Sequence, residues 1–531
     1  MIRKDSAARR SEVLGLNGAV ATSQPLAAQA GLQTLLAGGN AVDAALTAIT
    51  MLNVVEPMST GMGGDLFALV YVAAEHKVYA LNASGRSGAA CTVDAYRAQG
   101  LDRVPERGAL AVTVPGAVSG WYELSTRLGR MPFDRMLQSA IRYAEEGFAV
   151  SPLIAATWQS CEELLRRDPE TARTYLVHGR APRCGERFCQ PNLARSLRLL
   201  AEQGPDAFYR GPIARAIAHT IQTHGGLLTE EDLDAHTATW VEPIYTDYRG
   251  LRVWECPPNS QGVVALEALN ILSGVDLAAM PFDAPDTLHW KMEAIKFAMA
   301  DALGYVADPE HASVPVEQLL SHDHAARRRA EIDLQHALPN PLPGLSLGND
   351  TVYATAVDGE GNAASVINSL FLAFGSGLVA EGTGICLQNR GHLFVMDPQH
   401  PNCLAPRKRP FHTIIPCMVT ENDALRMSFG VMGGAMQPQG HVQVLTNIRD
   451  HGMGVQAAID APRFYYQQGA LHLIEPYFAD DTLAELRRRG HDLTIDEGGI
   501  FGGAQVIMVD PDSGALICGS EPRKDGCAVA F

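Results

Sequence analysis

Thr351 follows an irregular stretch of chain and begins a pattern typical of a buried strand. The preceding residues 337–350, ALPNPLPGLSLGND, contain three prolines and two glycines, which is typical of a connector. A threonine hydroxyl is a weak nucleophile, and a free α-amine on the same residue, with an ordinary pKa of about 8, would supply the base that it needs. Two interpretations follow: a linker before a strand-forming Thr, or a chain that cuts itself between Asp350 and Thr351 and uses the freed amine.

Gly433 and Gly434 are a second feature that could do chemistry. They end a short strand pattern, 427–431, and a helical pattern follows them. Two glycines allow the backbone to approach a ligand closely, and N–H groups at the start of a helix can stabilise an oxyanion. A plain strand-to-helix turn would give the same pattern, so both interpretations stay open.

The elements that would position these residues are predicted from apolar spacing and turn residues. Small residues in the predicted helices at 25–36 and 41–55 suit close burial of these helices against a sheet. The helix at 286–302 has Asp286 as its expected N-cap. The main predicted elements are helices at 25–36, 41–55 and 286–302, a buried strand at 66–71, and a hairpin of 351–357 with 363–370 around a turn at 358–362.

The composition excludes several classes of protein. Of the 531 residues, 47% are hydrophobic and 19% charged, so the chain can bury a large core, and its length alone predicts three or four domains. The net charge of −17 disfavours nucleic acid and anionic membranes as partners. There is neither a signal-peptide core near the start nor an apolar run of about 18 residues. The ten cysteines are scattered, with Cys184 and Cys189 the only close pair, so we expect free thiols, no metal site and a cytoplasmic location.

Many short motifs occur together in one order, and through them the chain resembles the γ-glutamyltranspeptidase family of N-terminal-nucleophile hydrolases over nearly its whole length. The matching stretches are GMGGDLF (61–67), VPGAVSGW (114–121), PPNSQG (257–262), DT (350–351), DGEGNA (358–363), FGSG (374–377), GTGI (382–385), KRP (408–410), GG (433–434), APRF (461–464) and PRKDG (522–526).

The resemblance implies an α+β fold, a four-layer αββα sandwich, made as a precursor that cuts itself into two chains, 1–350 and 351–531. These chains would stay together as a heterodimer and form one domain, and two heterodimers could associate. Thr351 matches the family's nucleophile, and Ser369 matches a second hydroxyl, normally Thr, that holds the new α-amine. Gly433 and Gly434 match the oxyanion hole. Arg86 lies where the family grips the substrate carboxylate, although an ungapped match puts Ser84 there.

Departures from the family pattern concern the substrate pocket. Phe371 stands where the family has Asn, and His412 and Thr413 stand where it has paired Ser. Arg390 and Leu393 replace its Gln and Asp. That Asp would pair with the α-amino group of a γ-glutamyl donor, and an ammonium buried beside Leu393 without a partner would cost several kcal/mol.

The positive charge of Arg390 is a further change in this pocket. Arg390 could bind a carboxylate through two parallel hydrogen bonds, or serve only a structural ion pair. His412 could contact substrate or be a core histidine with satisfied ring nitrogens.

The function expected from the resemblance is a self-processing threonine amidohydrolase or acyltransferase. It would cleave a small amide with a γ-glutamyl or related carboxylate-bearing acyl group through an acyl-Thr351 intermediate, without a metal or organic cofactor. One alternative is a dicarboxylyl acylase of the glutaryl or cephalosporin type, or another small-amide hydrolase without γ-glutamyl specificity. The other is a non-catalytic relative that is never cut.

Overall fold

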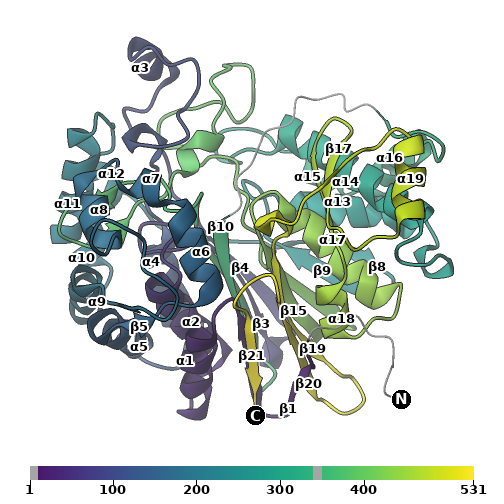
Figure 1. The fold of residues 1–531 in the computed structure, drawn as a ribbon, viewed down its shortest axis with the longest axis horizontal. Helices are drawn as coiled ribbons and strands as arrows, with labels where there is room; N and C mark the ends of the chain where they lie inside the picture. Colours follow the sequence, from purple (N-terminus) through teal and green to yellow (C-terminus); the bar gives the residue numbers. More distant parts are fainter. Residues whose placement is uncertain (1–9, 339–349) are drawn as a thin grey trace.

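In the computed structural model, which describes residues 10–338 and 350–531, two sheets of seven strands face one another (Figure 1). Neighbouring strands in both sheets run antiparallel. The first sheet has the order β21 (Cys527–Ala530), β2 (Gly18–Thr22), β10 (Asp350–Asp358), β11 (Ala363–Phe371), β3 (Asp65–Val72), β4 (Lys77–Ala83), β7 (Thr239–Val241). The second has the order β1 (Val13–Gly15), β20 (Leu516–Ser520), β19 (Gly503–Val509), β15 (Ala424–Met432), β14 (Cys417–Glu421), β9 (Leu251–Glu255), β8 (Ile244–Tyr248).

Helices cover the outer face of each sheet. Those on the side of the first sheet include α1 (Pro25–Leu36), α2 (Ala41–Val55), α4 (Ala117–Leu128), α5 (Phe133–Glu146), α9 (Pro191–Gln203) and α11 (Pro212–Thr223). Those on the side of the second include α13 (Gly262–Ser273), α14 (Pro285–Tyr305), α16 (His322–Glu331), α17 (Met436–Arg449), α18 (Val455–Asp460) and α19 (Asp480–Arg488). The prediction of a four-layer αββα arrangement is confirmed.

Shorter elements connect these layers. The helices are α3 (Val93–Ala98), α6 (Pro152–Ser160), α7 (Glu162–Leu165), α8 (Pro169–Tyr175), α10 (Asp206–Tyr209), α12 (Glu230–Asp234) and α15 (Val316–Leu319). The strands are β5 (Phe148–Ala149), β6 (Arg187–Phe188), β12 (Val379–Ala380), β13 (Ile385–Cys386), β16 (Phe464–Gln468), β17 (Leu471–Ile474) and β18 (Asp492–Ile495). The helices of the described residues all lack the combination of length and apolar character that a bilayer-spanning segment needs.

The buried cores explain why the central strands are apolar on both faces. In β3, Phe67 and Leu69 belong to the core between the sheets, whereas Leu66 and Ala68 belong to the core beneath the helices. Alternate side chains of a strand point to opposite faces, and here both faces are covered. The continuous apolar run predicted as a buried strand at 66–71 is therefore confirmed as part of β3.

Close helix packing follows from the small residues of α1 and α2. A Cβ added to Gly31 would lie 2.9 Å from the carbonyl oxygen of Ala44, so only glycine allows this approach. Asn40 is the N-cap at which α2 begins, because its side chain accepts hydrogen bonds from the N–H groups of Val42 and Asp43. The two predicted helices have the predicted bounds.

The prediction that Asp286 caps a helix is wrong. Helix α14 begins at Pro285, with Ala284 as its N-cap, so Asp286 lies in the first turn. Proline is favoured at the first helical position because its φ is already helical and its missing N–H is not needed there. The Asp286 carboxylate instead pairs with Arg489, next to the end of α19, with an N–O distance of 2.6 Å.

The predicted hairpin around 358–362 lies at the centre of the first sheet as β10 and β11. Asp358 fixes its turn, because Oδ1 accepts hydrogen bonds from the N–H groups of Glu360 and Asn362, each 3.0 Å long. The other carboxylate oxygen accepts from Ala41 N at the start of α2. Most of the predicted connector before β10, residues 339–349, lies outside the described residues.

Candidate active site

Thr351 is the second residue of β10, and it is only 3% exposed. Tyr353 and Val357, at alternate positions of the same strand, belong to the core between the sheets, so Thr351 lies on the face turned toward the second sheet. The register between β10 and β11 shifts at this end of the hairpin. There the hydroxyl oxygen of Thr351 lies 3.1 Å from that of Ser369, which is fully buried. The two predicted hydroxyl residues are in hydrogen-bond contact.

Arg390 is fully buried and reaches the same hydroxyl. Its Nη2 donates to Ser369 Oγ at 3.2 Å and its Nη1 donates to Thr413 Oγ1 at 2.7 Å. The guanidinium carbon lies 4.5 Å from the centroid of the Phe371 ring, and Nε lies 3.8 Å from Asp65 Oδ2. Burial lowers the pKa of Arg390 to about 9, although the Asp65 carboxylate acts in the opposite direction. Because the short contacts of the guanidinium are with neutral hydroxyls, its charge is only partly compensated.

His412 is also fully buried, and both of its ring nitrogens have partners. Nδ1 accepts a hydrogen bond from Ile414 N at 3.3 Å, and Nε2 lies 3.2 Å from Asp65 Oδ2. An acceptor at Nδ1 leaves the proton on Nε2, which then donates to the carboxylate. Burial and the nearby Arg390 charge lower the pKa of His412 to about 3, so the ring is neutral at pH 7. This is the arrangement expected of a core histidine, and contact with substrate stays a prediction.

The glycine pair follows β15 on the opposite sheet. Thr355 Oγ1 lies 2.6 Å from Ser428 Oγ, and two residues further on, a Cβ added to Gly430 would meet the ring of Tyr353. These contacts run toward Thr351 on β10 and toward the glycine pair on β15. Gly433 has φ +124° and Gly434 has φ +55°, both in the left-handed region.

The backbone N–H groups of Gly433 and Gly434 are available to a ligand, because neither donates a hydrogen bond to another described residue. Gln261 connects this turn to the Arg390 group, since its Nε2 donates to Gly434 O at 2.9 Å and also to Thr413 O. A continuous set of hydrogen bonds therefore runs from the glycine turn through Thr413 and Arg390 to the hydroxyls at β10 and β11.

Arg86 belongs to a different group of side chains. Its Nη2 donates to both carboxylate oxygens of Glu310, at 2.9 and 3.0 Å. Arg409 Nη1 also lies 3.5 Å from Glu310 Oε1, and Arg409 Nε donates to the carbonyl of Ser84. Among the described residues, no hydrogen bond joins Arg86 to the Thr351 group, and Ser84 donates to Asn82. Binding of a substrate carboxylate by Arg86 or Ser84 stays a prediction.

Asp65 and Gln261 are the residues that sequence reasoning missed. Asp65 accepts hydrogen bonds from Gly85 N and from His412, and lies near Arg390. Both residues stand inside motifs that carried the resemblance, GMGGDLF and PPNSQG, but a motif match alone does not show which members reach the site. The available signal for Asp65 was an acidic residue between a glycine-rich run and an apolar strand. A carboxylate buried there needs polar or charged partners, which indicates a cluster of such side chains.

Three groups of potential metal ligands occur among the described residues, and all lie outside the Thr351 group. In one of them, Glu293 is paired with Lys296 at 2.6 Å. In another, Asp301 is paired with Arg328. A cation already compensates an acidic member of both groups, which disfavours a metal ion there. The third group consists of Glu255, Cys417 and His441.

Known proteins resemble this chain over nearly its whole length. The family model described as Gamma-glutamyltranspeptidase matches residues 27–531. The glutathione hydrolase-like YwrD proenzyme of Bacillus subtilis is 39% identical over 527 residues, which cover 98% of this chain and 99% of the relative. The oxamate amidohydrolase proenzyme of Klebsiella pneumoniae is 38% identical over 98% of this chain and 100% of the relative.

A solved structure resembles the whole chain. The crystal structure of cephalosporin acylase from Bacillus halodurans superimposes with a TM-score of 0.94 and 47% sequence identity. The match covers 100% of this chain and 99% of the acylase chain.

Proposed function

The chain belongs to the γ-glutamyltranspeptidase family of N-terminal-nucleophile amidohydrolases, and from this premise we propose that it is a self-processing threonine enzyme that cleaves amides of a carboxylate-bearing acyl group. Thr351 is the proposed nucleophile, and Gly433 and Gly434 form the proposed oxyanion hole. The observation that carries the proposal is the contact between Thr351 and Ser369, whose hydroxyl also accepts a hydrogen bond from the buried guanidinium of Arg390.

Maturation begins with attack of the Thr351 hydroxyl on the carbonyl carbon of Asp350. The peptide C–N bond breaks as the acyl group moves from nitrogen to oxygen, and water then hydrolyses the ester. The products are the Asp350 carboxylate and the free α-amine of Thr351. Both sheets contain strands from each of the resulting chains, 1–350 and 351–531, so the products would remain associated as a heterodimer.

Turnover uses the same hydroxyl. The α-amine takes the proton of Thr351 Oγ1 as this oxygen attacks the substrate amide, and the N–H groups of Gly433 and Gly434 stabilise the oxyanion. The amine leaves with a proton, and water or an acceptor amine then takes the acyl group. Loss of one oxyanion donor typically lowers kcat about 100- to 1000-fold. The proposed reaction uses only the named groups of this chain, the substrate amide, and either water or an acceptor amine.

Arg390 and Leu393 are the residues from which we propose that the acyl group of the substrate carries a carboxylate and no α-amino group. The short hydrogen bonds of Arg390 go to neutral hydroxyls, so a substrate carboxylate would compensate its charge. Leu393 is buried and offers no anion to an α-ammonium group. Oxamate, named in one relative, is itself an amide that carries a carboxylate, and another relative is named a cephalosporin acylase. Of these names, oxamate supports a carboxylate-bearing acyl donor without an α-amino group.

Two p-nitroanilides test this proposal, because glutaryl and γ-glutamyl groups differ only in the α-amino group. We expect a higher kcat/KM for the glutaryl compound by about tenfold or more, since an unpaired ammonium costs more than about 1.4 kcal/mol. A strong preference for the γ-glutamyl compound would contradict the proposed pocket. A denaturing gel tests processing: two fragments are expected, and a single full-length band would favour the non-catalytic alternative.

We also propose a cytoplasmic location and a functional unit of at least one heterodimer. All ten cysteines are free thiols, and Cys184 and Cys189 are exposed. Exposed thiols are typical of a reducing compartment, which supports the proposed location. Association of two heterodimers is an extension of this proposal, and native mass spectrometry would measure it.

A further inference from the structure

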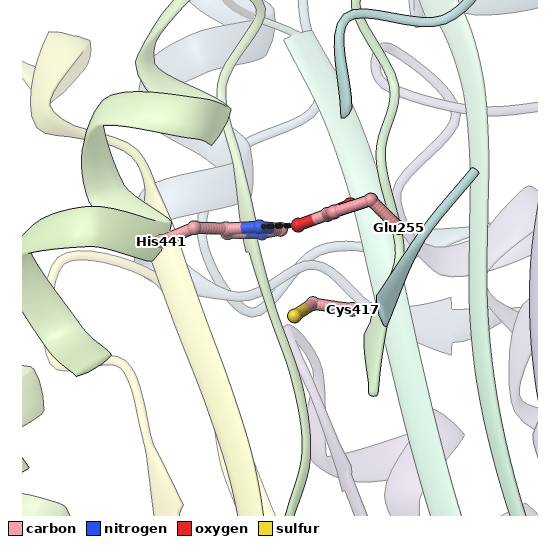
Figure 2. A group of neighbouring side chains, drawn as sticks. All are labelled: Glu255, Cys417 and His441. Carbon is pink, nitrogen blue, oxygen red and sulfur yellow. Dashed lines mark hydrogen bonds and ion pairs between the residues drawn. The ribbon is translucent and has the colours of Figure 1, made fainter. Parts of the chain in front are cut away.

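Glu255, Cys417 and His441, from the second sheet and α17, form a fully buried group (Figure 2). They come from the end of β9, the start of β14 and the second turn of α17. His441 Nδ1 lies 2.7 Å from Glu255 Oε1, as the dashed line in Figure 2 shows. Their donor types would suit a transition-metal ion.

The hydrogen bonds of His441 disfavour a metal ion. Its Nε2 accepts a hydrogen bond from the backbone N–H of Val431 at 3.1 Å. An acceptor at Nε2 places the ring proton on Nδ1, which donates to Glu255. Neither nitrogen then has a free lone pair for a metal. Burial and the Glu255 carboxylate also raise the pKa of the Cys417 thiol, which disfavours the thiolate that a metal would bind.

The place of Val431 in the second sheet gives His441 a different role. On one side β15 pairs with β19 up to Met432, but on the other side its pairing with β14 ends at Phe429 and Cys417. Val431 N therefore lies beyond the end of β14, and the imidazole of His441 takes the position that a neighbouring strand would fill. Glu255 pairs with Cys417 in the sheet and reaches across it to fix the ring.

We propose that His441, oriented by Glu255, is a positioning residue that holds the end of β15 and thereby aims the N–H groups of Gly433 and Gly434 at the oxyanion. Val431 is two residues from the pair, so a shift of this strand end moves both donors. An oxyanion hole requires donors about 3 Å from the oxygen, so a small shift weakens transition-state binding. The inference rests on the proposed function through the oxyanion role of the two glycines.

His441→Leu tests the inference with whichever anilide the unaltered enzyme turns over. It removes both hydrogen bonds, and we expect kcat to fall about tenfold or more with KM nearly unchanged, because the oxyanion exists only in the transition state. The boronic acid analogue of the glutaryl group, which forms a tetrahedral adduct with Thr351, should bind more weakly by a similar factor. Glutarate, the product of glutaryl hydrolysis, has a trigonal carboxylate carbon and should bind as before.

Conservative variants separate positioning from a general loss of structure. His441→Gln can place an amide oxygen near Val431 N and should recover part of kcat, and Glu255→Gln should lose less than Glu255→Leu because it keeps an acceptor for Nδ1. Cys417→Ala, the matched control in the same group, should keep wild-type kcat and boronate affinity. Equal weakening of glutarate and boronate by His441→Leu, or unchanged kcat, would overturn the inference. Losses in Cys417→Ala as large as those in His441→Leu would also overturn it and favour a shared site.

The glycines themselves provide the check on the premise. Gly433→Ala forces a side chain onto a backbone with φ +124° and must move the turn. If this variant keeps its kcat, the proposed oxyanion hole is wrong. If it loses kcat while His441→Leu does not, only the positioning role is wrong.

Discussion

Ser369 is the residue through which the charge of Arg390 reaches the nucleophile, and its hydroxyl can be removed with little change in volume. Ser369→Ala should lower kcat about 10- to 100-fold, because a hydrogen bond to a charged group contributes about 1.5–3 kcal/mol, here to the placement of the reacting groups. Ser369→Thr keeps the hydroxyl and should retain most of the activity. Steady-state kinetics and the rate of self-cleavage measure the effect.

Ser365 offers a matched control for this variant. It lies on the same strand and its hydroxyl contacts Tyr353, away from Arg390. Ser365→Ala should leave kcat within about twofold while lowering stability by about 1 kcal/mol. If the two alanine variants have the same kcat, Ser369 has no special role.

His236 allows a pH prediction for a single side chain. It is buried, and neither ring nitrogen has a hydrogen-bond partner among the described residues. Burial and the charges of Arg409 and Arg86 lower its pKa to about 3. Because the unfolded chain takes up this proton near pH 6.5 and the folded chain does not, His236 reduces stability as the pH falls below 6.5 and has no such effect above it.

His236→Leu removes this proton uptake without breaking a hydrogen bond. The variant should be within about 1.5 kcal/mol of the wild type at pH 7.5. At pH 5.0 the difference should move in favour of the variant by about 2 kcal/mol, which is the linkage for 1.5 pH units. Thermal midpoints of both proteins at the two pH values measure the change. A difference that does not vary with pH would contradict the lowered pKa.

At the residue scale, sequence reasoning identified Thr351 and Ser369 through family motifs, and the structure brings their hydroxyls together. It could not show that Arg390 contacts both Ser369 and Thr413, because these residues meet only through long-range folding. Asp65 was missed for the same reason: its partners Gly85, His412 and Arg390 are distant in sequence. Local motifs indicate which residues are candidates for the site. The packing of the two sheets determines which of these residues contact one another.

At the scale of elements, the contact between β10 and β15 determines where the nucleophile lies relative to the glycine turn. Gly430 makes this contact possible, because a Cβ there would lie 2.6 Å from the Tyr353 ring. Gly430→Ala should therefore lower both stability, by about 1–3 kcal/mol, and the rate of self-cleavage, since the two strands must move apart. The thermal midpoint and the fraction cut over time measure these effects.

A second substitution tests the cause. Tyr353→Leu makes room, so the double variant should recover cleavage relative to Gly430→Ala alone. Gly304→Ala is the control, because a Cβ there meets nothing within 4 Å and its φ is not in the left-handed region. Equal losses in Gly304→Ala and Gly430→Ala would show that the effect is not a steric contact between β10 and β15.

Elements with strong local signals were predicted well. The helices α1 and α2, the strand β3 and the hairpin of β10 and β11 all follow from small residues, continuous apolar runs and an Asp-Gly turn. The hairpin of β8 and β9 was not predicted, because it lies in a region where helical patterns dominate and its strands are short. The start of α14 was misplaced because two favourable signals, Pro285 and Asp286, stand side by side.

At the scale of the whole molecule, the length of the chain suggested several domains. Each of the two large sheets, however, combines strands from distant parts of the sequence. The first sheet contains β2, β3 and β4 from one side of the proposed cut and β11 and β21 from the other. The second sheet mixes β8 and β9 with β14, β15, β19 and β20 in the same manner. Neither proposed chain contains a complete sheet, so neither should fold without the other.

This interleaving predicts how cleavage changes unfolding. The uncut Thr351→Ala chain should unfold as one molecule, with a thermal midpoint that does not depend on protein concentration. The cut protein should release two chains on unfolding, so its midpoint should rise with concentration by mass action. Scanning calorimetry over a hundredfold range of concentration compares the two. A concentration-independent midpoint for fully cut protein would show that unfolding is not coupled to separation of the two chains, and would contradict this prediction.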